Sequence, residues 1–272
     1  MNSLDRSVSR TLRGLAAGLG LGACIATLRG AENTQMAVAP GRAAAQSATR
    51  VGQWEPFELS MTANHDFANA YVETLPDDGK TYAQVTFAGT SGEAKGLSYI
   101  VTGFWDGGKD WKARFAPPAP GEWSYSSTSS DAGLQGVQGS FQCTSWTAEE
   151  KAANPARHGF VRVVSQGPRA GRHFEYADGM PFLWIGDTWW AWARKGAPIE
   201  RFQQVVDDRS SRGFSVGQYM YCANNASRLV GRDFSTPDFE SIHNAERMIA
   251  YANSKGITLW IGACWSAKDL DQ

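Results

Sequence analysis

The stretch MPFLWIGDTWWAW, residues 180–192, decides the fold, because an apolar run in it ends in an acid and three tryptophans. Phe182 to Ile185 is a short continuous apolar run that follows the turn dipeptide Asp178-Gly179, a pattern typical of a strand covered on both faces. Gly186 ends the run and Asp187 follows it. Ligands of α/β folds bind at the carboxyl ends of parallel strands. The stretch therefore predicts a buried strand that leads into a polar, aromatic site.

The side chains after this strand suit a sugar ring. Indole rings offer an apolar face to its C–H groups, and a carboxylate accepts hydrogen bonds from its hydroxyls. Asp187 is predicted to contact substrate, and a turn cap or a pair with a nearby arginine is an alternative of equal weight. Trp189, Trp190 and Trp192 are predicted as a sugar platform. For each of them singly, packing beneath the loop is the alternative.

Composition limits the class of protein. With 272 residues, 42% hydrophobic and 19% charged, the chain is globular and long enough for two domains with separate cores. A net charge of -1 without basic blocks argues against nucleic acid as the main partner. The 11 tryptophans favour a carbohydrate ligand only weakly, because sandwich cores also use tryptophan.

The amino terminus has the features of an export signal. Arg6, Arg10 and Arg13 precede an apolar stretch at 14–28, which is too short and too rich in glycine to span a bilayer comfortably. We therefore expect an exported protein, and we expect residues 1–50 to be a leader followed by a flexible linker.

Two processing sites remain open in this leader. The sequence LGAC at 21–24 resembles a bacterial lipobox, in which Cys24 would be lipidated and attach the protein to a membrane. The small residues at 43–45 offer a later peptidase site. The expected location is therefore periplasmic, extracellular or the outer membrane as a lipoprotein.

Residues 51–147 show short runs in which apolar and polar residues alternate, as in half-buried strands. The predicted strands lie at 57–62, 83–87, 97–104, 111–115, 123–125 and 141–143. Six or seven strands in roughly 90 residues match an immunoglobulin-like sandwich. We interpret this all-β domain as a structural accessory rather than a sugar-binding module.

Residues 155–272 alternate between strand and helix patterns. The predicted elements are a hairpin (160–164 and 173–176), a strand (182–186), a helix from Pro198 to Gly213, a strand (214–221), a helix opened by Thr236-Pro237 and ended by Gly256, and a strand (257–261). This order implies a parallel sheet with right-handed crossovers. A (β/α) barrel needs eight strands in about 250 residues. We therefore expect an incomplete α/β barrel of the TIM type, from the amino-terminal part of a larger protein or from a truncated gene product.

Several motifs carry a resemblance to known families. The motifs HGFVRV (158–163), RHFEYADGMPF (172–182) and GDTWW (186–190) resemble the start of apiosidase-like glycoside hydrolases of the DUF4038 type, and 239–256 is similar to their second barrel helix. The motifs GFWDGG (103–108), KARFAP (112–117) and GEW (121–123) resemble the DUF5060 sandwich that commonly precedes such barrels. The resemblance covers roughly residues 52–265.

The resemblance implies an exported glycosidase that acts on plant or microbial polysaccharide. Glycoside hydrolysis requires two carboxyl groups that flank the scissile bond. In similar barrels the pair is expected on later strands, beginning around the fourth, so no catalytic residue is expected within this chain, and the chain alone is expected to be inactive. A non-catalytic carbohydrate-binding protein and a surface-adhesion module are the alternatives.

Other strand ends supply the remaining candidate site residues. Tyr221 and Asn224 follow the second predicted parallel strand and Trp265 follows the third, and all three are predicted to bind substrate. The pair Asn224-Asn225 also fits ordinary turn chemistry. The histidines lack metal-ligand spacing, so neither a metal nor a cofactor is expected.

The cysteines leave two states open. Cys222 and Cys264 end neighbouring predicted strands, so a disulfide between them is one alternative. Adjacent strands of one sheet rarely give the geometry of a disulfide, so we expect buried free thiols, including Cys143.

Overall fold

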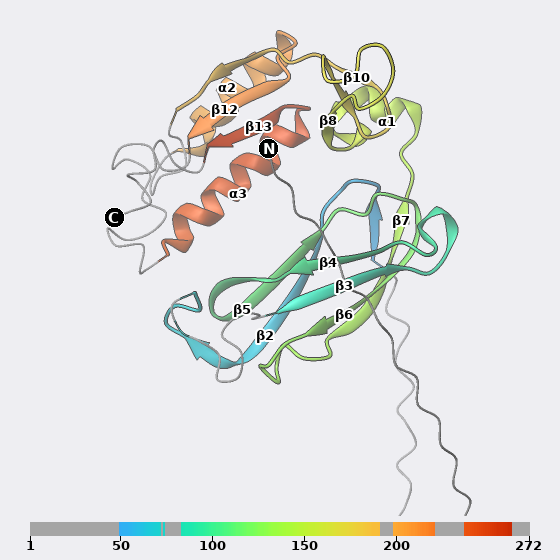
Figure 1. The fold of residues 1–272 in the computed structure, drawn as a ribbon. Helices are drawn as coiled ribbons and strands as arrows, with labels where there is room; N and C mark the ends of the chain where they lie inside the picture. Colours follow the sequence, from blue (N-terminus) through green and yellow to red (C-terminus); the bar gives the residue numbers. More distant parts are fainter. Residues whose placement is uncertain (1–48, 72, 74–82, 191–197, 221–236, 263–272) are drawn as a thin grey trace, which may run out of the picture. The chain divides into compact units, whose positions relative to one another are not determined.

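Figure 1 shows the computed structural model of the chain, which describes residues 49–71, 73, 83–190, 198–220 and 237–262. Residues 45–272 form one compact unit. The first part of this unit is built from β1 (Arg50–Gly52), β2 (Phe57–Phe67), β3 (Gln84–Gly89), β4 (Ser98–Thr102), β5 (Phe104–Phe115), β6 (Gly121–Thr128) and β7 (Gln138–Thr144), with a short 3-10 helix, η1 (Gly92–Ala94). The predicted strands of this part are confirmed in position except the one at 97–104.

These strands form two sheets around one core. The five-stranded sheet has the order β1-β7-β6-β3-β4, and β2 pairs with β5 in the second sheet. Inward-facing residues of both sheets alternate with exposed ones, so that Phe57 stacks on Phe141 with ring centroids 4.2 Å apart and Phe87 stacks on Phe115 at 4.5 Å. Cys143 is buried in this core as a free thiol, and burial raises its pKa to about 11.

One predicted strand of the sandwich is two strands. The prediction 97–104 spans the end of β4 at Thr102 and the start of β5 at Phe104. Between them the Gly103 N–H donates to the carbonyl of Ala83. The chain therefore leaves one sheet and enters the other at this glycine, a change that an apolar run does not reveal.

The second part contains α1 (Ala148–Ala153), the 3-10 helix η2 (Pro155–His158), β8 (Val161–Val163), β9 (Phe174–Tyr176), β10 (Pro181–Phe182), β11 (Gly186–Thr188), α2 (Ile199–Ser211), β12 (Val216–Met220), α3 (Phe239–Ser254) and β13 (Thr258–Gly262). A capping box between Thr147 and Glu150 starts α1, and the Asn154 side chain caps η2. The predicted hairpin is confirmed as β8 and β9, which pair with β10 in a three-stranded sheet.

The prediction of one strand at 182–186 is wrong. Phe182 pairs with Phe174 in the hairpin sheet, whereas β11 begins at Gly186 and pairs with β12. Leu183 is 72% exposed, and Trp184 and Ile185 are also exposed, so the run is not covered on both faces. The run crosses from one sheet to another, and its residues therefore cannot pair throughout as a single strand.

The parallel arrangement is confirmed. The sheet has the order β11-β12-β13 with both pairs parallel, and α2 and α3 connect the strands. Pro198 is the N-cap residue of α2 rather than its first helical residue, and Asp238 caps α3 by accepting a hydrogen bond from the Ser241 N–H at 3.3 Å. Gly213 and Gly256, with φ of 78° and 75°, follow the two helices as predicted.

The helices pack on one face of this sheet. Phe202 and Val206 of α2 and Met248 and Ala252 of α3 are buried together with Trp189 and Ile257. Among the described residues, no helix is both long enough and apolar enough to cross a membrane.

Helix α3 also contacts the sandwich strand β5. The Phe239 ring lies edge-on to Trp105 with centroids 5.0 Å apart. One turn further along, His243 Nε2 lies 2.8 Å from an Asp106 carboxylate oxygen, and Arg114 donates to Glu246 at 2.6 Å. Phe239, His243 and Glu246 are three or four residues apart, so they form one stripe along α3, and this stripe contacts the sandwich.

Candidate functional site

The two faces of the parallel sheet carry different residues. Because side chains alternate along a strand, Asp187 and its register partner Gly217 face one side, and Thr188 with Gln218 faces the other. The contacts of Asp187 with α2, given below, place the first set on the helix-covered face. We call the other side, which carries Thr188, Gln218 and Trp260, the open face.

Asp187 lies in an ion pair and a hydrogen bond within the helix-covered face. Arg209 Nε of α2 donates to one carboxylate oxygen at 2.6 Å, and the indole N–H of Trp189 donates to the other. The carboxylate raises the pKa of the Arg209 guanidinium. The structure therefore gives Asp187 the arginine partner that the sequence left open, and its contact with substrate stays a prediction.

Trp189 is a core residue of the helix-covered face. It is 5% exposed, and its ring lies edge-on to Phe202 with centroids 5.9 Å apart. A Cβ atom at Gly217 would lie 2.4 Å from the indole, so only glycine fits beneath this ring. In this position Trp189 packs under the strand end, and a role in contacting sugar stays a prediction for this residue.

Trp190 differs from its neighbour in exposure. It is 55% exposed and has a φ of 40°, in the left-handed region. Its ring is therefore accessible at the strand end. Of the described tryptophans predicted for the platform, Trp190 is the one whose exposure suits a ligand.

The open face brings together three residues that the sequence did not single out. Thr188, Gln218 and Trp260 share one row across β11, β12 and β13. The Thr188 hydroxyl lies 3.5 Å from the Gln218 side-chain oxygen, and Trp260 is 50% exposed. Thr188 directly follows Asp187 on β11, and successive side chains of a strand point to opposite faces. Once the face of Asp187 is known, this alternation places Thr188 and its row on the other face.

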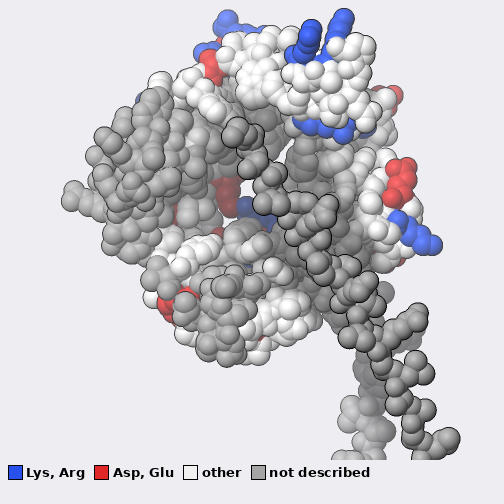
Figure 2. All heavy atoms as spheres, viewed as in Figure 1, with Lys and Arg blue, Asp and Glu red and all other residues white. Residues whose placement is uncertain are grey.

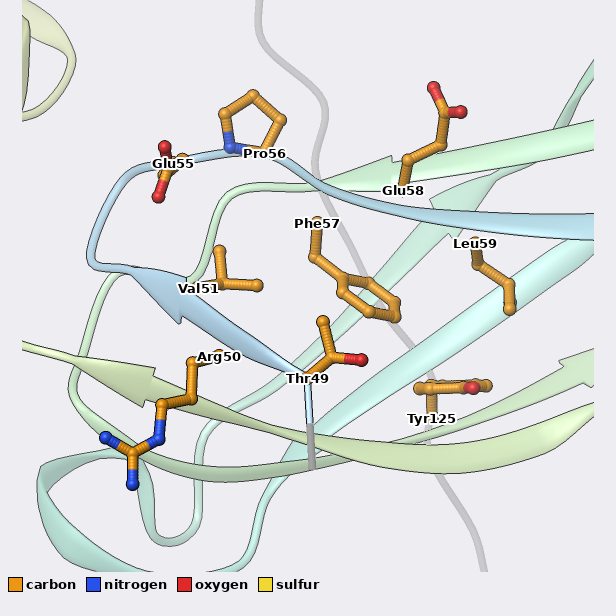
Figure 3. A pocket seen from close by; sticks show the side chains of 9 residues that line it. All are labelled: Thr49, Arg50, Val51, Glu55, Pro56, Phe57, Glu58, Leu59 and Tyr125. Atoms are coloured by element: carbon orange, nitrogen blue, oxygen red, sulfur yellow. The ribbon is translucent and has the colours of Figure 1, made fainter. Parts of the chain in front are cut away.

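The sandwich contains a pocket that none of these residues lines. A pocket of about 550 Å³ is lined by residues of β1, β2 and β6 and their flanks, namely Thr49, Arg50, Val51, Glu55, Pro56, Phe57, Glu58, Leu59 and Tyr125. Figure 3 shows Phe57 and Leu59 pointing toward Tyr125, while Glu58 points away. The pocket reaches core side chains and contains none of the predicted site residues.

The other predicted site residues, Trp192, Tyr221, Asn224 and Trp265, lie outside the described residues, as do the cysteines 24, 222 and 264. Within the described part of the chain, no three His, Cys, Asp or Glu side chains come together to hold a metal ion.

The described part of the chain is a β-sandwich followed by a parallel βαβαβ unit, with hydroxyl, amide and indole groups on the open face of its sheet. Residues 168–271 match the family model of the apiosidase-like catalytic domain. Residues 50–130 match DUF5060, a domain of unknown function. The resemblances to DUF5060 and, after it, to the apiosidase-like family are therefore confirmed.

One solved structure supports the fold. The chain is similar to a protein assigned as a glycoside hydrolase from Bacteroides vulgatus, with a TM-score of 0.56 and 21% sequence identity over 78% of this chain and 41% of that chain. A family 5 glycoside hydrolase from the same organism has a TM-score of 0.30 and 17% identity, covering 40% of this chain and 25% of that one. The chain thus spans about two fifths of the length of the first of these structures. A comparison with curated proteins finds no match.

Proposed function

We propose that the chain is the sugar-binding, amino-terminal part of an exported glycoside hydrolase that acts on plant or microbial polysaccharide. The observation that carries the proposal is the apiosidase-like match over residues 168–271, which falls on a parallel sheet with an exposed tryptophan on its open face. In this proposal β11, β12 and β13 are the first three strands of a (β/α) barrel. Their parallel order and helical connections support that assignment.

Catalysis requires more than the described strands supply. Two carboxyl groups must flank the glycosidic bond. Among the described residues of the open face, Gly186, Thr188, Val216, Gln218, Thr258 and Trp260, none is acidic, and Asp187 faces Arg209 instead. We therefore expect the 272-residue chain to bind sugar without cleaving it.

The test compares two proteins. The purified 272-residue chain is incubated with plant and microbial polysaccharides and assayed for new reducing ends, and no release is expected. The reading frame that contains the chain together with any codons after Gln272 is assayed in the same way, and release is expected there. Turnover by the 272-residue chain would contradict the inference that it lacks the catalytic carboxyl pair. Inactivity of both proteins on all substrates would contradict the proposal of a glycoside hydrolase.

The charge distribution supports a carbohydrate partner rather than nucleic acid. The chain has 26 Lys and Arg against 27 Asp and Glu residues. On the face shown in Figure 2, described acidic side chains lie next to basic ones in several places. Nucleic-acid binding relies on a basic surface that follows the phosphate backbone.

Export and lipid attachment at Cys24 are part of the proposal. The arginines before the apolar stretch at 14–28 and the LGAC motif support them. Cell fractionation with mass spectrometry of the mature amino terminus tests both. The variant Cys24→Ser is expected to lose membrane association, whereas an unprocessed protein in the cytoplasm would contradict export.

A non-catalytic carbohydrate-binding protein is the second candidate function. The observation that favours it is the open face without a described carboxylate. A stop codon directly after Gln272 in the natural gene, together with sugar binding by the chain, would support this candidate over the hydrolase.

A further inference from the structure

We propose that the sandwich, which matches a domain of unknown function, serves as an intramolecular docking surface for helix α3, and that this contact stabilises both domains. The docking surface consists of Glu58, Trp105, Asp106, Lys112 and Arg114, all within the DUF5060 match at 50–130. Helix α3 lies within the apiosidase-like match at 168–271. Because the contact involves neither a sugar nor a catalytic group, it is independent of the proposed function.

The sheet of β2 and β5 has an outer face that a helix can cover. A two-stranded sheet is only marginally stable in water, and packing against a helix stabilises it. Along β5, Ala113 and Phe115 are buried in the sandwich core, so Arg114 between them points outward. The strand register places Glu58 of β2 opposite Arg114 on this outer face. Arg114 also donates to Glu246 at 2.6 Å, so α3 lies against the outer face.

An aromatic side chain of α3 extends the core of the sandwich. Phe239, the first residue of the helix, packs against the buried cluster of the sandwich. Its ring centroid lies 5.0 Å from that of Trp105, whose indole N–H donates to the Gly108 carbonyl at 2.9 Å. A Cβ atom at Gly107 would lie 3.3 Å from the Phe239 ring, and the φ of 106° at Gly107 also favours glycine. The sandwich therefore carries a seat that fits this ring.

Six ionisable side chains join α3 to the sandwich in a chain in which bases and acids alternate. The order is His243, Asp106, Lys112, Glu58, Arg114 and Glu246, with N···O distances of 2.8, 2.9, 3.3, 2.7 and 2.6 Å between successive members. Asp106 and Glu58 each use one carboxylate oxygen for each of their two neighbours. The chain begins and ends on α3, so the helix completes it at both ends.

This chain of side chains makes the contact selective. Partial burial raises the pKa of Asp106, but hydrogen bonds from His243 and Lys112 outweigh it and lower the pKa. The hydrogen bond to Glu246 raises the pKa of Arg114. Isolated ion pairs at a surface contribute little, whereas networks contribute more. A helix without His243 and Glu246 would leave half-buried charges of the sandwich with fewer partners, so the docking surface fits α3 in particular.

The buried thiol of Cys143 reports whether α3 stabilises the sandwich. Cys143 is 1% exposed in the core that Phe239 extends, so it reacts with a thiol reagent only when the sandwich opens. In the full chain with Cys24, Cys222 and Cys264 replaced by serine, Cys143 is the only thiol. The measurement is the rate at which dithionitrobenzoate labels this thiol in the absence of denaturant.

Variants of α3 are compared in this background. Phe239→Ala empties the seat beside Trp105 and is expected to speed the labelling of Cys143 about tenfold, and Phe239→Leu less. Glu246→Arg places a second cation beside Arg114 and is expected to speed labelling about threefold. Adding Arg114→Glu makes the two charges opposite again, so it is expected to restore part of the protection.

Two matched controls leave the contact with the sandwich intact. Tyr251→Ala removes an aromatic ring from the stripe of α3 that meets Asp207 of α2, and Glu175→Arg reverses an acid whose partner, Arg162, lies in the hairpin. Both are expected to leave the labelling rate of Cys143 unchanged. An unchanged rate in both Phe239→Ala and Glu246→Arg, or an equal acceleration by the two controls, would overturn the docking surface.

Discussion

Phe87 and Trp260 are both aromatic residues on β-strands, but Phe87 is fully buried and Trp260 is 50% exposed. Phe87 lies between two sheets that share one core, whereas Trp260 lies on a sheet whose helices cover the opposite face. In the sandwich, aromatic rings stack on one another and supply stability. On the parallel sheet an indole is left accessible, which suits binding.

The largest expected effect is on the sandwich core. Phe87→Ala removes a ring that stacks on Phe115 at 4.5 Å and leaves a cavity in a fully buried site, so we expect a loss of about 3–5 kcal/mol in the free energy of unfolding. Urea unfolding followed by circular dichroism measures it. Trp260→Ala is the comparison and is expected to change stability by less than about 0.5 kcal/mol. Equal losses for both variants would remove the contrast between the two regions.

The next effect concerns the helix-covered face of the parallel sheet. In Gly217→Ala the new methyl group would lie 2.4 Å from the Trp189 indole, so we expect a loss of about 1–3 kcal/mol from overpacking. Adding Trp189→Leu makes room for the methyl group. The loss in the double variant should therefore be smaller than the sum of the two single losses. Simple additivity would show that Trp189 does not press on Gly217.

A smaller effect is expected at the Asp187 ion pair. Asp187→Asn keeps the shape of the side chain but removes its charge opposite Arg209, so the urea midpoint is expected to fall by less than in Gly217→Ala. Arg212→Gln, which breaks the exposed pair with Asp208, is the control and should change the midpoint less still. If Asp187→Asn leaves stability unchanged but abolishes sugar binding, Asp187 acts on the ligand rather than on the fold.

The smallest effect depends on pH and concerns the hairpin. Partial burial raises the pKa of Asp178, but hydrogen bonds from Lys151, His158 and the Met180 N–H outweigh it and lower the pKa to about 2 from an ordinary value of 3.8. The contribution of Asp178 to stability is therefore present above pH 3.8 and is lost as the pH falls through 2.

Unfolding curves of the natural chain and Asp178→Asn test this dependence. Their difference is expected to shrink as the pH falls from about 4 toward 2. A difference that does not change with pH would mean that Asp178 acts through shape alone.

The sandwich could be predicted from its sequence because its strands are buried on one side. In β2, Phe57, Leu59 and Met61 are buried and the residues between them are exposed, so the period of two is visible along the chain. The parallel sheet offered a weaker pattern. Its run from Leu183 to Ile185 is apolar, yet it lies between two sheets and is exposed.

The location of the candidate site could be predicted from the sequence, but the set of residues that form it could not. Its location at the strand after Phe182 was indicated by the acid and the tryptophans. The face that each residue occupies became clear only from Arg209 of α2, which pairs with Asp187 and lies 22 positions beyond it. Thr188, Gln218 and Trp260 come from three separate strands, so only the register of the sheet brings them into one row.

The stripe of α3 that contacts β5 restricts which β-sandwich can be combined with this parallel βαβαβ unit. Phe239, His243 and Glu246 meet side chains of the sandwich, while Met248 and Ala252 of the same helix lie in the core beside β13. A foreign sandwich grafted onto the parallel βαβαβ unit would need counterparts of Trp105, Asp106 and Arg114 at matching positions. Without them, Phe239, His243 and Glu246 would lose the partners that they contact in this chain.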